Sequence, residues 1–340
     1  MKKFLLSLLF LFSLNIVSAQ SPLMATLDHN GEITHFFSTN ALVNAMKVAQ
    51  DGDIITLSSG AFVGTAITKS ITLRGSAMDN MYGDNTRTII NDNISVTAND
   101  TSHYITFENI RFSNYLTISG GSVKNMKIKK CYIGSFNQSS KCQIYGLTIE
   151  NCRIENLYAY NGSSYSQLFK DFQLINSIIG YLSTTIDRTL IVNCTIGNRP
   201  GTMKNCEIWN SVIVDTNSSS LDASSTAYNC LGYTTSTSST YKMFPNLTDI
   251  TNWQLNKSEA SIFLDDRINS SYNAGFYSYE LVDEIKNTYL GTDGTQVGMY
   301  GGFLPYTTRP SGPKITKCNV AQKSTIDGKL SVEIEVTTQE

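Results

Sequence analysis

One short pattern recurs seven times along this chain: an apolar residue, any residue, Asn, a small residue, any residue and an apolar residue. The third position, called the slot below, is Asn109, Lys130, Asn151, Asn176, Asn193, Asn210 and Asn229. The slots are separated by 21, 21, 25, 17, 17 and 19 residues. A period near 20 residues with short strands is typical of a solenoid, in which each repeat stacks on the one before it.

Side chains on either side of the slot are predicted to alternate between the interior and the exterior of this solenoid, because successive side chains of a strand point to opposite faces. Counted from the slot, positions −2, +1 and +3 should point inward, and positions −1 and +2 outward. The inward positions are mostly apolar, as at Ile149 and Ile154. The slot itself is predicted to form a sharp bend in the left-handed region, which Asn tolerates best after Gly. Stacked Asn side chains can also hydrogen-bond along this ladder.

Four of the seven cysteines directly follow a slot: Cys131, Cys152, Cys194 and Cys230. Ser177 and Ser211 take the same place in other repeats. We interpret this position as one interior column of small residues, with reduced thiols. Disulfides, which are usual in exported proteins, are the alternative.

The N-terminus has the features of an export signal. A basic start is followed by an apolar run over 4–14 and by the small residues Val17, Ser18 and Ala19. This predicts a signal peptide over 1–19 and an exported chain: secreted, periplasmic or at the cell surface. No later apolar run is long enough to span a membrane, and a net charge of −2 argues against a nucleic-acid partner.

Residues 38–50 are predicted to form a helix that covers the first repeat, since an open solenoid end exposes core and strand edges. Leu42, Ala45 and Met46 share one face, and Ser38 or Thr39 can cap the start.

The remaining boundaries follow from the extent of the repeat. We expect the solenoid to occupy 20–302, with regular repeats over about 104–232 and an irregular segment over 241–290. A Pro-rich linker and a terminal strand fill 303–340, and the Gly-rich stretch within 292–302 can close the coil.

The helix, the Asp51-Gly52-Asp53 turn, the stretch 67–75 and the Asn-bearing repeats resemble the right-handed parallel β-helix superfamily, which includes pectate lyases and polygalacturonases. The Gly-rich stretch and Pro-rich exit are most similar to uncharacterised exported bacterial members. The resemblance covers about residues 35–302. It implies an all-β fold: a right-handed parallel β-helix solenoid with an N-terminal capping helix.

The outward positions change character along the chain. They are largely charged in the first three repeats and largely apolar from the Asn176 repeat onward: Ile175, Ile178, Val192, Trp209, Val212, Tyr228 and Leu231. Exported monomers rarely leave such a patch bare. We therefore expect that this face is covered, either by residues 241–290 or by a second subunit or partner.

Catalytic residues are not apparent. Glycoside hydrolysis needs clustered acids, which no repeat carries, and the polygalacturonase motifs are absent. Arg111 and Arg153, near Lys127 and Lys129, form a basic spot that we interpret as a solvated ladder of ion pairs with Glu108 and Glu150. The three His are scattered, so we expect no metal site and no cofactor.

The longest repeat inserts a loop that carries Tyr158, Tyr160, Asn161, Ser164 and Tyr165. Extra loops on solenoids often carry function. These tyrosines are a candidate platform for stacking sugar rings, with the Asn and Ser as hydrogen-bond partners. Alternatively, they pack on the outer surface of the coil.

The sequence thus favours an exported protein that binds glycan or another macromolecule at the cell surface without catalysis. The alternative is a diverged polysaccharide lyase or glycoside hydrolase that acts on an acidic polysaccharide. A purely structural or adhesive rod is the third possibility.

Overall fold

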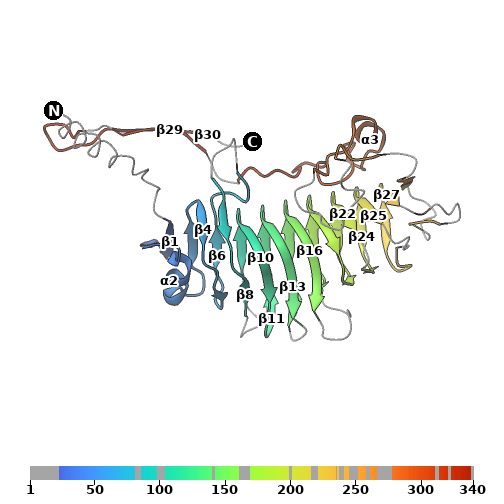
Figure 1. Ribbon diagram of the computed structural model, residues 1–340, viewed down its shortest axis with the longest axis horizontal. Helices are drawn as coiled ribbons and strands as arrows, with labels where there is room; N and C mark the ends of the chain where they lie inside the picture. Colours follow the sequence, from blue (N-terminus) through green and yellow to red (C-terminus); the bar gives the residue numbers. More distant parts are fainter. Residues whose placement is uncertain are drawn as a thin grey trace, which may run out of the picture.

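The computed structural model shows a parallel β-helix, as the sequence predicts (Figure 1). It describes residues 23–80, 86–97, 104–139, 142–160, 169–198, 201–215, 221–234, 236, 241–244, 252–257, 261–265, 278–310, 314–320 and 323–337. The predicted signal peptide lies outside these residues. Neither helix in the described part of the chain is long and apolar enough to cross a membrane.

The coil has three walls: sheet A, sheet B and a third wall to which only the middle turns contribute strands. Sheet A contains β1 (Met24–His29), β2 (Glu32–Phe37), β3 (Ile54–Leu57), β6 (Thr72–Arg74), β9 (Thr106–Glu108), β12 (Lys127–Lys129), β15 (Thr148–Glu150), β18 (Gln173–Ile175), β21 (Leu190–Val192), β24 (Glu207–Trp209) and β26 (Thr226–Tyr228).

Sheet B follows sheet A across the slot. It contains β4 (Gly60–Phe62), β5 (Ala66–Ile67), β7 (Thr88–Ile90), β8 (Ile94–Val96), β10 (Arg111–Ile118), β13 (Tyr132–Ser139), β16 (Arg153–Tyr160), β19 (Ile178–Leu182), β22 (Thr195–Asn198), β25 (Val212–Asp215), β27 (Leu231–Thr234) and β28 (Trp253–Asn256). The third wall is shorter and consists of β11 (Ser122–Lys124), β14 (Gln143–Tyr145), β17 (Phe169–Lys170), β20 (Ile186–Asp187) and β23 (Met203–Lys204).

Equivalent residues of successive turns lie in register, so that side chains stack in columns. Ile128 pairs with Phe107 on one side and with Ile149 on the other, and all three are fully buried. The column just after the slot is also buried, including Cys131, Cys152, Cys194 and Cys230. Six buried cysteines are free thiols: Cys131, Cys142, Cys152, Cys194, Cys206 and Cys230.

Every slot residue adopts a positive φ, between 43° at Asn176 and 57° at Asn109. The slot is therefore a left-handed bend that turns the chain from sheet A to sheet B. Its backbone N–H donates to the next turn, as Asn151 N does to the carbonyl of Ile175 at 3.0 Å.

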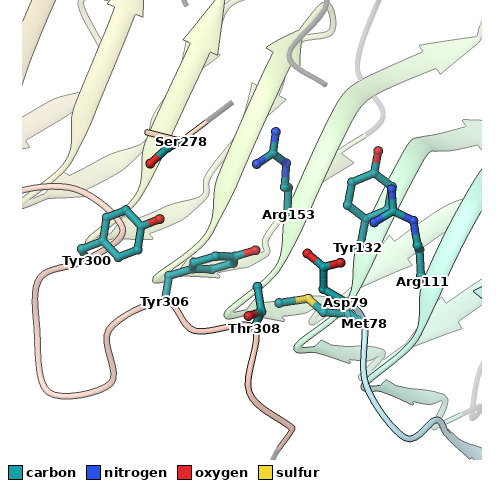
Figure 2. Close-up of a pocket in the computed structure, with 9 residues that line it drawn as sticks. All are labelled: Met78, Asp79, Arg111, Tyr132, Arg153, Ser278, Tyr300, Tyr306 and Thr308. Atoms are coloured by element: carbon teal, nitrogen blue, oxygen red, sulfur yellow. The ribbon is translucent and has the colours of Figure 1, made fainter. Parts of the chain in front are cut away.

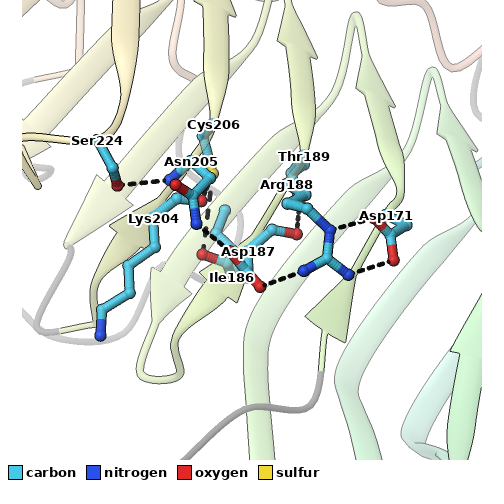
Figure 3. Close-up of polar contacts among 9 residues, drawn as sticks. All are labelled: Asp171, Ile186, Asp187, Arg188, Thr189, Lys204, Asn205, Cys206 and Ser224. Atoms are coloured by element: carbon cyan, nitrogen blue, oxygen red, sulfur yellow. Dashed lines mark hydrogen bonds and ion pairs between the residues drawn. The ribbon is translucent and has the colours of Figure 1, made fainter.

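A second left-handed column, five residues before the slot, was not predicted. It turns the chain from the third wall to sheet A, and its residues are Asn125, Gly146, Asp171, Arg188 and Asn205, with φ between 49° and 66°. This mixture of residue types gives no repeating signal. Arg188 is held there by two bonds of 2.6 Å to Asp171 and one of 2.9 Å to Asp187 (Figure 3).

The N-terminal helix, α2 (Ala41–Val48), covers the first turn and buries Leu42, Ala45 and Met46. It is shorter than predicted, and its N-cap is Asn40, without a side-chain capping bond, rather than Ser38 or Thr39. The sequence also missed the antiparallel hairpin of β1 and β2, which precedes the helix and pairs with β3.

The C-terminal part of the chain runs back along the outside of the coil (Figure 1). After α3 (Asp283–Thr288), residues 290–309, called the strap below, pass the slots in reverse order. Asn229 Nδ2 donates to Leu290 O at 3.0 Å, and Asn176 Nδ2 donates to Gly301 O at 2.7 Å. Lys130 Nζ donates to Arg309 O at 3.0 Å. The sequence suggested that the Gly-rich stretch closes the coil; instead, the strap lies along its side.

The outward apolar columns lie on different walls, because the slot bend separates them. Position +2 on sheet B is covered: Ile178, Val212 and Leu231 are buried in one cluster with Ile262, Phe263, Leu281, Val297 and Met299. Position −1 on sheet A, with Ile175, Val192, Trp209 and Tyr228, is only partly buried. The segment that covers sheet B extends beyond residue 290. Cover of the sheet A column by a second subunit or partner stays a prediction.

The strands β29 (Lys314–Val320) and β30 (Val332–Thr337) form an antiparallel hairpin that pairs with no other strand in the described part of the chain. Figure 1 draws this hairpin away from the coil.

Candidate functional site

A cavity of about 220 Å³ lies where the strap crosses the first regular turns of sheet B (Figure 2). Its lining combines residues that are far apart in the sequence: Met78, Asp79, Arg111, Tyr132, Arg153, Ser278, Tyr300, Tyr306 and Thr308. The coil supplies the floor, and the strap supplies one wall. We call this cavity the strap pocket.

Three residues in one column form the floor. Arg111, Tyr132 and Arg153 all occupy position +2 and pair in register on β10, β13 and β16. The guanidinium carbon of Arg111 lies 3.7 Å from the centroid of the Tyr132 ring, close enough for a cation–π contact. Burial lowers the pKa of Arg111, whereas Tyr132 and Asp79 raise it.

A buried ion pair fixes the second arginine. Arg153 Nε donates to Glu155 Oε1 at 2.7 Å, and Glu155 is only 7% exposed. Burial lowers the pKa of Arg153, but the neighbouring Glu155 more than offsets this effect. Burial raises the pKa of Glu155, although Arg153 opposes it. Removing either partner alone would leave a buried charge uncompensated.

The strap contributes two tyrosines to the wall. Tyr300 and Tyr306 contact each other edge-on, with centroids 6.0 Å apart and an interplanar angle of 80°. Burial raises the pKa of both hydroxyl groups. The two hydroxyls are therefore neutral near pH 7, where a tyrosine can both donate and accept a hydrogen bond.

This set of groups suits a small, oxygen-rich ligand. Guanidinium forks bind carboxylates in a bidentate manner. A carboxylate such as Asp79 accepts hydrogen bonds from hydroxyl groups, and tyrosine rings offer apolar faces. The volume of about 220 Å³ leaves room for several waters and so for a small ligand. No group of three His, Cys, Asp or Glu that could hold a metal ion occurs among the described residues.

The pocket was missed because the sequence placed its arginines with the wrong partners. Glu108 pairs with Arg74 at 3.0 Å and Glu150 pairs with Lys129 at 3.2 Å, all on sheet A. Arg111 and Arg153 lie beyond the slot bend, on sheet B. The predicted ladder of ion pairs therefore forms without them. Their shared +2 position was the available signal, but the strap that completes the site carries no repeat.

The predicted tyrosine loop is described only at its start. Tyr158 lies on β16 and packs edge-on against Tyr115, with centroids 6.2 Å apart and an interplanar angle of 88°. Tyr160 ends the same strand, and the position of its side chain is not among the described features. Asn161, Ser164 and Tyr165 lie outside the described residues. Tyr158 does not line the strap pocket.

A parallel β-helix is a scaffold on which many activities are built, so the fold alone assigns none. The chemistry of the strap pocket must therefore carry any functional argument. No protein-family model, no curated protein and no solved structure matches this chain.

Proposed function

We propose that this chain is an exported, pectate-lyase-like β-helix protein that binds an acidic glycan at the cell surface without cleaving it, with one acidic sugar in the strap pocket. The observation that carries the proposal is the in-register column Arg111–Tyr132–Arg153 beneath the strap tyrosines. Export rests on the basic, apolar and small-residue pattern of residues 1–19.

In this proposal the arginines recognise the sugar carboxylate. A hydrogen bond to a charged group contributes about 1.5–3 kcal/mol, more than a neutral one, and the pocket is partly shielded from water. Asp79 and the tyrosine hydroxyls then bind ring hydroxyls, and Tyr132, Tyr300 and Tyr306 supply apolar surface. Two arginines against Asp79 and the buried Glu155 leave these four groups without net charge, so the proposal rests on direct hydrogen bonds from the guanidinium groups to the carboxylate.

The test is calorimetric titration of the folded protein with oligosaccharides of galacturonate, mannuronate and glucuronate. Arg111→Met should weaken binding of the acidic ligand by about 10- to 100-fold, from the loss of one charged hydrogen-bonding group. Arg111 is the better target because it contacts the Tyr132 ring, whereas Arg153 is bonded directly to the buried Glu155.

Two further variants act as controls. Arg74→Met removes an arginine of sheet A that pairs with Glu108 and should leave affinity unchanged. The double variant Arg153→Met/Glu155→Leu removes both members of the buried pair together, and it should lose affinity while staying folded. Equal affinity of wild type and Arg111→Met for every acidic ligand that binds would refute the pocket assignment.

Lyase chemistry is the second candidate, because it also needs a cation beside a sugar carboxylate and a base near it. The strap tyrosines are poor bases, since burial raises the pKa of Tyr300 and Tyr306 and keeps both protonated. Binding without turnover is therefore favoured. Assays for unsaturated uronates and for new reducing ends, run on the same polymers, decide between the two: product formation that Arg111→Met abolishes would establish the enzyme.

A further inference from the structure

Sheet B carries a second polar and aromatic surface beyond the strap pocket. Its side chains come from four successive turns, on β10, β13, β16 and β19, and we call it the tyrosine face: Tyr115, Ser135, Asn137, Asn156, Tyr158 and Tyr181. Tyr115 pairs with Ser135, Ser135 with Asn156, and Asn156 with Tyr181. Asn137 pairs with Tyr158 in the neighbouring column.

The tyrosines of this face are accessible and held in place. Tyr115 is 45% exposed, and Tyr158 contacts it edge-on at 6.2 Å. Burial and, after it, the hydrogen bond to Tyr115 together raise the pKa of Tyr158 to about 12. Its hydroxyl is thus a neutral hydrogen-bonding group at any physiological pH. Asn156 is anchored by a 3.2 Å bond from Nδ2 to Gly134 O.

The face also lacks exposed charge. Among the described outward side chains of these four strands beyond position +2, the one formal charge belongs to Glu155, which is 7% exposed and bonded to Arg153. The same turns of sheet A carry Glu108, Lys129 and Glu150. Nucleic acids and acidic polymers bind through basic side chains, and this surface offers them none.

We infer that the tyrosine face is a binding site for a neutral polysaccharide that lies along the axis of the coil. Turns of the coil repeat about every 4.8 Å, close to the length of one hexose unit in an extended chain. Each of the four turns therefore presents a hydroxyl, an amide or an aromatic ring at about the spacing of successive sugars. Tyrosine has the amphipathic ring and the polar hydroxyl that such a surface needs. This site is separate from the strap pocket. It would extend the range of ligands of the protein from acidic to neutral glycans.

Native electrophoresis of the full chain in gels that contain β-glucan, mannan, xylan or amylose tests this inference. The wild type should be retarded by at least one of these polymers. Tyr115→Ala should weaken the retardation by about 2- to 10-fold, the range expected for one aromatic contact. Tyr158→Phe keeps the ring but loses the hydroxyl, so it should retain most of the binding. Tyr104→Ala, at a tyrosine that is 62% exposed outside this face, is the matched control and should bind as wild type does.

The outcomes separate this site from the pocket. Retardation that Tyr115→Ala lowers and Arg111→Met leaves unchanged supports two sites. If the wild type migrates freely through all four neutral polymers, the tyrosine face is not a glycan-binding site. The titrations with acidic oligosaccharides then still test the strap pocket separately. Loss of neutral binding in Arg111→Met, or slow migration that depends on protein concentration without any polymer, overturns the inference in favour of a single site or of self-association.

Discussion

At the scale of the residue, a slot side chain can both permit a bend and hold the strap, as Lys130, Asn151, Asn176, Asn210 and Asn229 do. Asn tolerates the left-handed region with less strain than most residues, and its amide presents a donor and an acceptor on the outside of the bend. Asn210 uses both, with Thr292 N donating to its Oδ1 at 2.9 Å and its Nδ2 donating to Thr292 Oγ1 at 3.2 Å. The recurrence of Asn therefore reflects two requirements.

Two substitutions at Asn176 should separate these roles. Asn176→Gly keeps the bend but loses the bonds to Met299 O and Gly301 O, which should cost about 1–3 kcal/mol in the free energy of unfolding. Asn176→Ala loses the same bonds and adds left-handed strain of about 1–2 kcal/mol. Denaturant titration should rank the stabilities as wild type, Gly and then Ala. If Gly and Ala are equally stable, the bend is not strained.

The buried cysteines lead to a pH prediction. Burial raises the pKa of the Cys194 and Cys230 thiols from 9.0 to about 12. A raised folded-state pKa means that stability is fully present below about pH 9 and falls as pH rises toward 12. The melting temperature should decline across this window.

The same thiols should resist modification in the native protein, because the thiolate is the reactive form. Ellman's reagent at pH 8 should label almost none of the six buried cysteines before unfolding and most of them afterwards, without added reductant. Labelling of one or none in denaturant would mean that disulfides form.

At the scale of the element, local pattern explains what the sequence predicts and what it misses. The bend at Asn151 and the burial of Ile149 and Ile154 depend on neighbours within one repeat, so period and alternation predict them. The strap bonds Asn176 to Gly301 through a backbone carbonyl, which any residue supplies. This contact joins two residues that are 125 positions apart in the chain, so no local sequence pattern predicts it. The strap half of the pocket was unpredictable for the same reason.

Two glycines test the attachment of the strap. Gly302, with φ of 78°, faces Asn193 so closely that a Cβ would clash with its amide. Gly294, with φ of 76°, has nothing within 4 Å of its Cβ position. Gly302→Ala should detach the strap locally and increase its cleavage in limited proteolysis, and it should weaken the strap pocket. Gly294→Ala has the same backbone strain without the clash, so equal cleavage of the two variants would contradict this account.

At the scale of the whole molecule, the coil and strap form one unit to which the terminal hairpin adds little. β29 and β30 pair only with each other among the described strands, and an isolated two-stranded hairpin is marginally stable in water. Val332, Ile334 and Val336 of β30 are each about half exposed. The hairpin thus buries little apolar surface of its own.

Truncation after residue 310 should therefore leave the coil intact. The shortened protein should melt within a few degrees of the full chain and keep its affinity for acidic and neutral glycans. Differential scanning calorimetry with parallel titrations measures both properties. A large drop in melting temperature would show that the hairpin docks on the coil in solution.

The reverse course of the strap has a consequence for how such a chain can change in length. A solenoid alone can gain or lose a repeat, since each repeat contacts only its neighbours. Here the strap bonds to Asn229 at residue 290, to Asn176 at residue 301 and to Lys130 at residue 309. Its length must therefore match the number of turns between these slots. Inserting or deleting one repeat would move every later slot away from its partner residue in the strap. Two distant stretches of the chain must therefore lengthen or shorten together, and the number of turns is fixed by a segment that contributes none of them.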